Sequence, residues 1–242
     1  MRGSVPQDYR WFGDEGSQLE GGFATLPPDD VRLVSAVFFV LFVVSTIAFF
    51  PRSSRRADRI VRSFRPRSFV TGPLWEAILF VVFLTPLAEA LIPGWVYGGP
   101  LTFGFPLDSI AQGLGIVVWL AGGGLAILAQ RRLGRFTRPE IEVVADHQLI
   151  TSGPYRWIRH PLYTALLMMS VGVALFLLNG LLGVLFLVAC GVAWRRAVAE
   201  EDLLASEGGF GATYRTYMER TGRFLPRLRS KAPNLETNGR AP

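Results

Sequence analysis

Long apolar runs alternate with short polar segments through most of the chain. The first run, Val31–Phe50, has one charged side chain, at its edge, and matches the roughly 20 residues that a helix needs to cross about 30 Å of hydrocarbon. The same pattern predicts four further spans, at Leu74–Ile92, Ser109–Ala129, Leu162–Leu178 and Leu181–Trp194. The pattern therefore predicts an all-α, polytopic integral membrane protein with about five transmembrane helices.

The last two apolar runs are separated by Asn179-Gly180, which is typical of a turn. We therefore expect a tight helical hairpin, followed by a cytosolic C-terminal helical tail. Both runs are short for complete spans, so protein or flanking interfacial residues should protect their ends. The third span contains three consecutive glycines, Gly122 to Gly124, which would let another helix approach closely.

Composition agrees with a membrane protein and limits the available chemistry. Half of the 242 residues are hydrophobic, 18% are charged and the mean hydropathy is +0.32, which excludes disordered, collagen-like and disulfide-scaffold proteins. The single cysteine, Cys190, rules out an intrachain disulfide. With only two histidines, His147 and His160, there is also little material for a zinc site, so we expect no metal.

The net charge of +6 comes almost wholly from arginine, and the arginines are unevenly distributed. One group lies between the first two spans and a second group follows the third: Arg52, Arg55, Arg56, Arg59, Arg62, Arg65 and Arg67, then Arg131, Arg132, Arg135, Arg138, Arg156 and Arg159. The segment Pro93–Asp108 has neither lysine nor arginine. The positive-inside rule therefore predicts an exterior N-terminus with the basic loops and the tail in the cytoplasm, and we expect a bacterial plasma membrane.

The basic loop Pro51–Arg67 has an alternative interpretation as a nucleic-acid patch. No aromatic-laced groove accompanies it, so we favour a solvated, lipid-facing loop that sets the topology. We accordingly expect membrane lipids, and no nucleic acid, as partners.

Polar residues concentrate on both sides of the predicted hairpin. Asp146–Tyr163 precedes it and Trp194–Pro226 follows it, and both are rich in arginine, tyrosine and other polar residues. A hairpin returns the chain to the same membrane face, so residues about forty apart in sequence can meet. The pattern predicts one pocket holding arginines, histidines, tyrosines and two glutamates.

The motifs in these two segments resemble the isoprenylcysteine carboxyl methyltransferase family. They are His147-x-Leu149-Ile150-Thr151-Ser152-Gly153-Pro154-Tyr155, Arg159-His160-Pro161-x-Tyr163, Glu200-Glu201-x-x-Leu204 and Phe210-Gly211-x-x-Tyr214-x-x-Tyr217. Phospholipid N-methyltransferases and methanethiol S-methyltransferases share parts of the pattern. The resemblance covers roughly Leu133–Pro226 and departs at Thr164 and Ala165, where the family usually has a glycine close to the tyrosine.

The resemblance implies an S-adenosylmethionine-dependent methyltransferase whose cofactor site is built from the last helices and the cytosolic tail, without a Rossmann domain. It assigns cofactor contacts to His147, Gln148, Leu149, Ile150, Tyr155, His160, Pro161, Leu162, Tyr163 and Glu200. It assigns positioning of the methyl acceptor to Arg196, one helical turn before Glu200.

The chemistry of the cofactor supports these residue types. Arg159 and His160 can bind its carboxylate through charge-assisted hydrogen bonds. Glu200 or Glu201 can accept from its ribose hydroxyls or its ammonium group. Leu149, Ile150 and Leu162 can supply an apolar wall for adenine, as small-molecule sites commonly require. Methyl transfer to a carboxylate or thiolate needs no general base, so alignment can supply most of the catalysis.

Several residues also have structural interpretations. Glu200 and Glu201 could form a solvated helix face with Arg195 and Arg196, and His160 could be a capping or interfacial residue. We expect Tyr214, Tyr217 and Arg223 to hold the tail under the membrane rather than to bind ligand; these three stand outside the predicted site.

The apolar runs and the resemblance together suggest how the chain is organised. We expect an exterior N-terminal segment at 1–30, three transmembrane helices with a basic cytosolic loop at 31–130, a methyltransferase core at 131–226 and a flexible tail at 227–242. The first thirty residues lack a basic-then-apolar secretory pattern, which favours a retained first helix over a cleaved signal.

Three methyl acceptors remain open: a carboxylate on a lipidated cysteine or similar molecule, a small thiol, and a lipid amine. A different class of function, a non-catalytic transporter or scaffold, is the further alternative. Glu76 and Glu89 lie near the ends of their span, and charges are scarce within spans, which disfavours transport.

Overall fold

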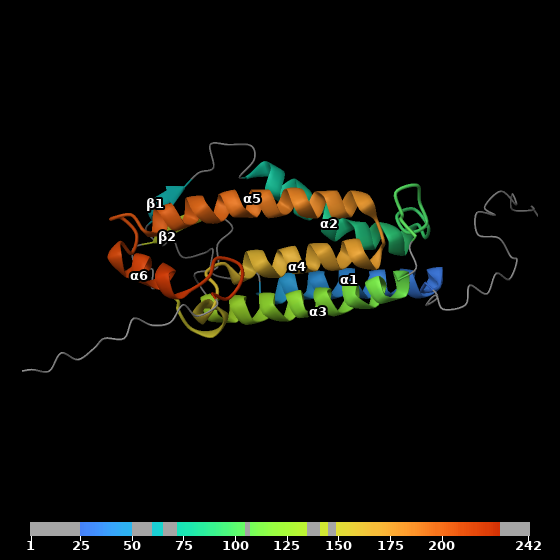
Figure 1. The fold of residues 1–242 in the computed structure, drawn as a ribbon, viewed down its shortest axis with the longest axis horizontal. Coiled ribbons are helices and arrows are strands. Elements are labelled where there is room, and N and C mark those ends of the chain that lie inside the picture. Colours follow the sequence, from blue (N-terminus) through green and yellow to red (C-terminus); the bar gives the residue numbers. More distant parts are fainter. Residues whose placement is uncertain are drawn as a thin grey trace, which may run out of the picture.

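The computed structural model describes residues 25–49, 60–64, 72–104, 107–134, 141–144 and 149–227. Figure 1 shows long helices running side by side, with a small helix at one end. In chain order the elements are α1 (Pro28–Phe49), β1 (Ile60–Phe64), α2 (Pro73–Leu91), α3 (Asp108–Leu133), β2 (Ile141–Val144), the 3-10 turn η3 (Gly153–Arg156), α4 (Pro161–Phe176), α5 (Gly180–Leu204) and α6 (Ala212–Arg220). Each predicted apolar run falls largely within one of the five helices α1 to α5.

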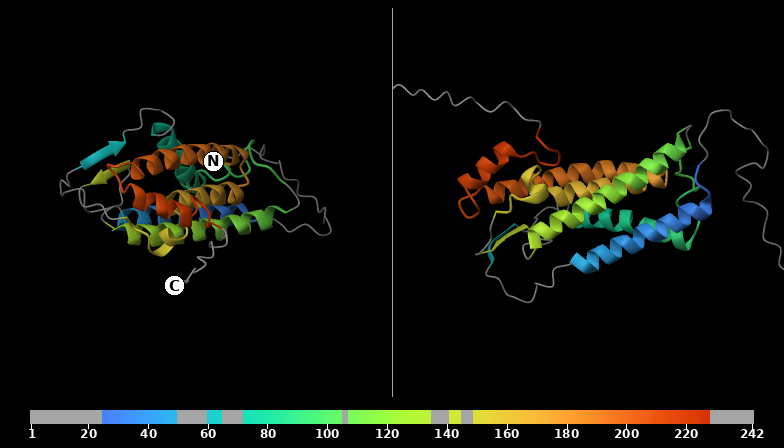
Figure 2. Two further views of the ribbon diagram at one scale, coloured as in Figure 1. Left: turned by 60° about the vertical axis from the view of Figure 1, so that its left-hand side comes forward. Right: turned by 90° about the horizontal axis from the view of Figure 1, so that it is seen from below.

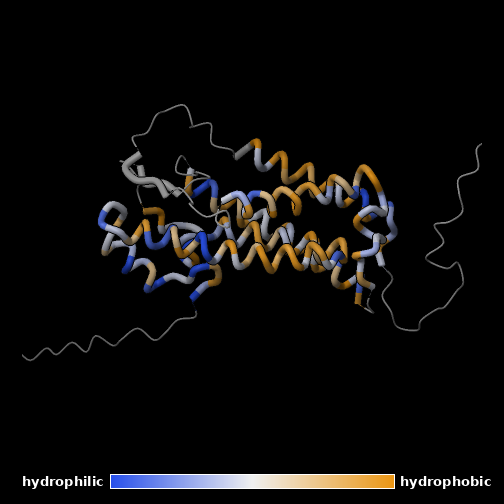
Figure 3. The backbone as a smooth tube through the Cα atoms, turned by 90° about the horizontal axis from the view of Figure 1, so that it is seen from above, coloured by the Kyte–Doolittle hydropathy of each residue, from blue (hydrophilic) through white to orange (hydrophobic). Residues whose placement is uncertain are grey.

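Within the described residues, four helices are long and apolar enough to cross a membrane. They are Pro28–Ile47 in α1 and the whole of α2, α3 and α5, whereas α4 is a shorter apolar helix. In Figure 3 hydrophobic residues dominate the middle of the bundle, and hydrophilic residues gather at the end that carries α6. The molecule is therefore a helical membrane protein, as predicted.

The helix that contains the fifth apolar run extends beyond the end of that run at Trp194. α5 continues to Leu204, because the polar segment after Trp194 is rich in alanine, glutamate, leucine and arginine, which all favour helix. At its other end Asn179 caps the helix, since the backbone N–H groups of Leu181 and Leu182 donate to its side-chain oxygen at 3.1 and 3.3 Å. One continuous helix thus carries Arg196, Glu200 and Glu201 beyond the apolar segment.

The tightest helix packing joins α3 to α4. A Cβ atom added at Gly115 would lie 2.7 Å from the carbonyl oxygen of Gly172, and one added at Gly172 would lie 2.8 Å from the carbonyl oxygen of Gly115. Within the predicted glycine run, Gly122 also faces α4, whereas Gly123 and Gly124 have open space around them. Close approach is therefore confirmed for Gly122 alone of the three, and Gly115 and Gly172 were not predicted.

Stacked aromatic rings pack α1 against α2, α3 and α4. The Phe38 ring of α1 stacks on the Trp119 ring of α3 with centroids 4.2 Å apart, and it also contacts Phe176 of α4 at 5.2 Å. The Phe42 and Phe83 rings stack in the same way between α1 and α2, at 4.1 Å. These contacts fix the first two helices against the α3–α4 pair.

The all-α prediction missed a short two-stranded sheet. β1 and β2 pair antiparallel, with Ile60 opposite Val144 and Phe64 opposite Ile141. β1 lies in the basic loop after α1, and β2 lies in the segment after α3. Figure 2 shows the two strands at the same end of the bundle as α6. The sheet therefore brings two arginine-rich parts of the sequence to one end of the molecule.

The opposite end is held by a buried carboxylate. Glu89, near the end of α2, accepts hydrogen bonds from the backbone N–H groups of Gly94, Val96 and Tyr97 at 2.9, 2.9 and 3.0 Å. The Asn179 side chain donates to the carbonyl oxygen of Val96 at 3.2 Å, which ties the same loop to the α4–α5 turn. Glu89 is thus a structural residue of this end.

Candidate active site

The two polar segments that flank the α4–α5 hairpin meet at one end of the bundle. His160 immediately precedes α4, and its ring nitrogens lie 3.7 Å from a carboxylate oxygen of Glu200 (Nδ1 to Oε2) and 3.1 Å from one of Glu201 (Nε2 to Oε1). Both glutamates lie near the end of α5. The predicted meeting of residues about forty apart in sequence is therefore confirmed.

The turn before α4 depends on one glycine. Gly153 begins η3 with a φ of +62°, in the left-handed region that favours glycine. A Cβ atom there would lie 2.8 Å from the Cγ atom of Arg132, because the last turn of α3 packs against this turn. The Ser-Gly-Pro-Tyr sequence thus places Tyr155 in a buried position beside the start of α4.

The Glu201 carboxylate accepts hydrogen bonds from two arginine side chains and one histidine side chain. Its Oε1 atom lies 2.8 Å from Arg159 Nε, 3.1 Å from His160 Nε2 and 3.0 Å from Arg223 Nε. Its Oε2 atom lies 2.6 Å from Arg223 Nη2 and 3.1 Å from Arg223 Nε. The Glu201 side chain is 2% exposed. We call these four residues the Glu201 cluster.

The Glu201 cluster binds residues 212–226, which consist of α6 and the segment after it and which we call the tail. The backbone N–H of Arg159 donates to the carbonyl oxygen of Gly222 at 2.8 Å, and Gly222 donates to Trp157 at 3.1 Å. The Arg159 guanidinium also donates to the carbonyl oxygens of Met218, at 3.0 Å, and Thr221. The guanidinium that was expected to bind a cofactor carboxylate is therefore engaged within the protein.

Side chains of the tail make further contacts with the site. The Tyr217 hydroxyl donates to the carbonyl oxygen of Tyr155 at 2.7 Å. The Arg223 guanidinium lies 4.3 Å from the centre of the Trp194 ring, and hydrogen bonding to Glu201 raises the pKa of Arg223. Tyr217 and Arg223 hold the tail, as predicted; the sequence did not indicate that Arg223 would reach Glu201.

Glu200 faces a different environment from its neighbour. It accepts a hydrogen bond from the Tyr163 hydroxyl at 3.1 Å, and its side chain is 30% exposed. Burial raises the pKa of Tyr155 and of Tyr214, and the nearby negative charge of Glu200 raises both further. These phenols stay protonated at neutral pH. Glu200 is therefore bonded to one tyrosine, acts electrostatically on two others and is partly exposed.

Arg196 lies on the same part of α5, one turn before Glu200. It is 6% exposed, and its guanidinium lies close enough to the Tyr163 side chain to interact with it electrostatically. Because Tyr163 also donates to Glu200, its hydroxyl lies between a guanidinium and a carboxylate. The expected proximity of Arg196 and Glu200 on one side of the helix agrees with this arrangement.

The remaining predicted contacts are less constrained by the structure. Leu149, Ile150 and Leu162 are partly buried and Pro161 is buried at the start of α4, and their assignment to a cofactor wall stays a prediction. His147 and Gln148 lie outside the described residues. The alternative of a solvated Glu201 paired with arginines of its own helix is wrong, because Glu201 is buried by residues of α4 and the tail.

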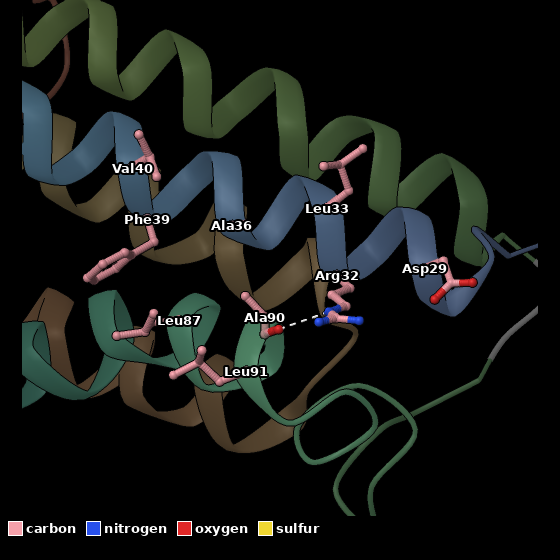
Figure 4. A pocket seen from close by; sticks show the side chains of 9 residues that line it. All are labelled: Asp29, Arg32, Leu33, Ala36, Phe39, Val40, Leu87, Ala90 and Leu91. Carbon is pink, nitrogen blue, oxygen red and sulfur yellow. Dashed lines mark hydrogen bonds between the residues drawn. The ribbon is translucent and has the colours of Figure 1, made fainter.

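A groove between α1 and α2 lies far from these residues. It has a volume of about 490 Å³ and is lined by Asp29, Arg32, Leu33, Ala36, Phe39, Val40, Leu87, Ala90 and Leu91. Figure 4 shows Arg32 at the end of the groove, where it donates to the carbonyl oxygen of Ala90 at 3.0 Å. The start of α1 and the end of α2 lie at the opposite end of the bundle from α6 (Figure 1). This groove is separate from the candidate site.

Comparison with known proteins tests the predicted family. Residues 115–206 match the model of the isoprenylcysteine carboxyl methyltransferase family. The resemblance predicted from the motifs is borne out over these residues. The matched segment contains α4, the whole of α5 and the motif residues from His147 to Glu201, and it ends before α6.

Curated relatives carry the same family name. The chain is 30% identical to protein-S-isoprenylcysteine O-methyltransferase of Rattus norvegicus, over 46% of this chain and 42% of the relative. It is 29% identical to that of Tribolium castaneum, over 57% and 50%, and 34% identical to that of Homo sapiens, over 49% and 45%. The chain thus spans about half the length of the curated relatives it matches.

A solved structure shares the fold. The structure of a eukaryotic intramembrane Ras methyltransferase, an isoprenylcysteine carboxyl methyltransferase, superimposes with a TM-score of 0.53 and 22% sequence identity. The superposition covers 83% of this chain and 68% of that chain. The arrangement of helices described above is therefore a fold that this family uses.

Proposed function

We propose that this protein is an S-adenosylmethionine-dependent membrane methyltransferase that acts on the carboxylate of a lipidated cysteine or a similar apolar molecule. The observation that carries the proposal is the meeting of Glu200, Tyr163 and Arg196 at the end of an apolar helical bundle, within the segment that matches the family. A carboxylate and a guanidinium, joined by one tyrosine hydroxyl, can serve a cationic donor and an anionic acceptor.

The residues around Glu200 fit the proposed cofactor. S-adenosylmethionine carries a sulfonium and an ammonium group, and cations are attracted both to carboxylates and to the faces of aromatic rings. Glu200 is partly exposed and accepts a hydrogen bond from Tyr163, and its charge raises the pKa of Tyr155 and of Tyr214. Under this proposal Glu200 binds the cationic part of the cofactor, while Leu149, Ile150 and Leu162 contact its adenine.

For methyl transfer the protein must align the acceptor with the methyl carbon and exclude water. When bound, the cofactor supplies a methyl carbon that is already activated by the sulfonium. Arg196 would hold the acceptor carboxylate with one of its oxygens aligned toward that carbon. Tyr163 would fix the positions of the Arg196 and Glu200 side chains relative to each other. A carboxylate acceptor is already the nucleophile at neutral pH, so no side chain needs to remove a proton.

Arg196 favours the carboxylate over the other two acceptors. A buried guanidinium attracts a carboxylate and would oppose the approach of a protonated lipid amine. A small thiol has no need for a site beside apolar helices, whereas the names of the curated relatives point to an acceptor with a lipid tail. The distribution of arginines supports an active site on the cytoplasmic side of the membrane and an exterior N-terminus, and we propose five spans in a bacterial plasma membrane.

Glu200→Gln should weaken binding of S-adenosylhomocysteine about 10- to 100-fold, because it removes one partner of a charge-assisted hydrogen bond. The measurement is calorimetry on protein purified in detergent. Glu207→Gln is the matched control, since Glu207 is an exposed glutamate just after α5, and its affinity should equal that of the wild type. If the wild type binds no ligand at millimolar concentration, the methyltransferase proposal fails.

Arg196→Ala should raise the KM for a prenylcysteine carboxylate about 10- to 100-fold and leave the affinity for S-adenosylhomocysteine within about threefold. The neighbouring Arg195→Ala, at an exposed position, should change neither. Transfer of labelled methyl groups from S-adenosylmethionine measures the KM. The same assay with thiols and with lipid extracts compares the other acceptors, and preferential labelling of either would contradict the proposed substrate class.

A further inference from the structure

The two consecutive glutamates of α5 face different partners. Glu200 is partly exposed and bonds a neutral tyrosine, whereas both oxygens of Glu201 are occupied by cationic or ring N–H groups. A carboxylate offers about four lone-pair positions, and the contacts from Arg159, His160 and Arg223 use them. Glu201 therefore has little capacity left for a ligand.

The partners of Glu201 come from two separate segments. Arg159 and His160 immediately precede α4, and Arg223 lies in the tail, beyond α6. The backbone pairs the same two segments, because the N–H of His160 donates to the carbonyl oxygen of Arg223 at 3.1 Å. Glu201, on α5, is thus the common anchor of both.

We propose that Glu201 is a positioning residue that fastens the tail 212–226 against the start of α4 before any cofactor binds. The cluster holds His160, whose ring stacks on Tyr163 with centroids 5.4 Å apart. It also holds the tail that carries Tyr214. Glu201 thereby sets the place of Tyr163, which donates to Glu200, and the place of α6, without touching the ligand itself. The consequence for cofactor affinity rests on the proposed function; the fastening of the tail does not.

The proposal requires a tail that is already ordered in the ligand-free protein. The backbone N–H groups of Arg159, His160 and Gly222 form the hydrogen bonds between the tail and the start of α4. Hydrogen exchange reports how often such bonds open. In the wild type these amides should be protected before any ligand is added.

Glu201→Gln should speed exchange of these amides at least about tenfold in the ligand-free protein, and should weaken binding of S-adenosylhomocysteine at least about tenfold. Glu89→Gln is the matched control, because Glu89 is also a buried carboxylate that accepts three hydrogen bonds, at the opposite end of the bundle. It should lower the Tm without changing either the exchange of the tail or the affinity. Arg223→Lys keeps the charge with fewer donors and should give intermediate exchange.

Exchange in Glu201→Gln equal to that of the wild type would overturn the proposal. Weaker binding with unchanged exchange would also overturn it, because Glu201 would then be a ligand contact. If Glu201→Gln does not fold, Arg223→Lys decides by the same exchange measurement. A wild type that binds no S-adenosylhomocysteine would remove the proposed function, while faster exchange in Glu201→Gln would still support the fastening of the tail.

Discussion

Arg159→Ala should lower the free energy of unfolding by about 3 kcal/mol, because it breaks a buried ion pair and leaves backbone acceptors without a donor. The Arg159 side chain is 9% exposed and bonds Glu201 and the carbonyl oxygens of Met218 and Thr221. Glu201 keeps its hydrogen bonds to His160 and Arg223, so the loss of stability should lie near the lower end of the range for breaking a buried ion pair. A thermal scan in detergent should show a Tm roughly 10 °C lower.

A second arginine near the tail provides the control. The exposed Arg215 donates one hydrogen bond to the carbonyl oxygen of Ala205 at 3.3 Å, and Arg215→Ala should change the Tm by less than about 2 °C. Arg159→Ala should also weaken binding of S-adenosylhomocysteine, since the tail that carries Tyr214 loses one of its attachments. A variant with the Tm of the wild type would contradict the structural role of Arg159.

The helices could be predicted because a membrane imposes one rule on every apolar run. A backbone in hydrocarbon must satisfy its own hydrogen bonds, so each run forms a helix. The ends were less predictable. The hydrophobicity pattern stops at Trp194, but α5 continues because the polar residues that follow also favour helix.

The meeting of His160 with the two glutamates was predictable from the hairpin alone, since antiparallel helices return the chain to its starting level. The different roles of Glu200 and Glu201 were not. Consecutive residues on a helix point about 100° apart, and what each one faces depends on where the tail lies. Glu201 faces the tail because Arg223 of the tail bonds its carboxylate. Nothing in the sequence around Arg223 indicated that Glu201 would be its partner.

The short sheet and the closest helix contact were missed for a related reason. β1 and β2 are five and four residues long and lie far apart in sequence, so neither has a local signal for its partner. Close helix approach was predicted at Gly122, Gly123 and Gly124 because they are consecutive glycines. The residues that do face a neighbouring helix depend on how α3 and α4 are rotated about their axes, which a single sequence does not specify.

Gly115→Leu should lower the free energy of unfolding by about 3 kcal/mol or more, because any side chain at this position must push α3 and α4 apart. A Cβ atom at Gly115 would lie 2.7 Å both from the carbonyl oxygen of Gly172 and from the backbone nitrogen of Phe176. Backbone atoms of a helix cannot turn aside as a flexible side chain can. Thermal unfolding in detergent measures the loss.

Gly113→Leu isolates the contact from the general effect of replacing a helical glycine. Both glycines lie in α3, and replacing either should gain roughly 0.5 to 1 kcal/mol of helix propensity. Gly113 has nothing within 4 Å of its added Cβ, so its variant should be as stable as the wild type or more stable. Equal Tm values for the two variants would show that α3 and α4 do not pack through Gly115.

A displacement of α3 should also disturb the candidate active site, because Arg132 of α3 packs against Gly153 in the turn before α4. Gly115→Leu should therefore weaken binding of S-adenosylhomocysteine, and Gly113→Leu should not.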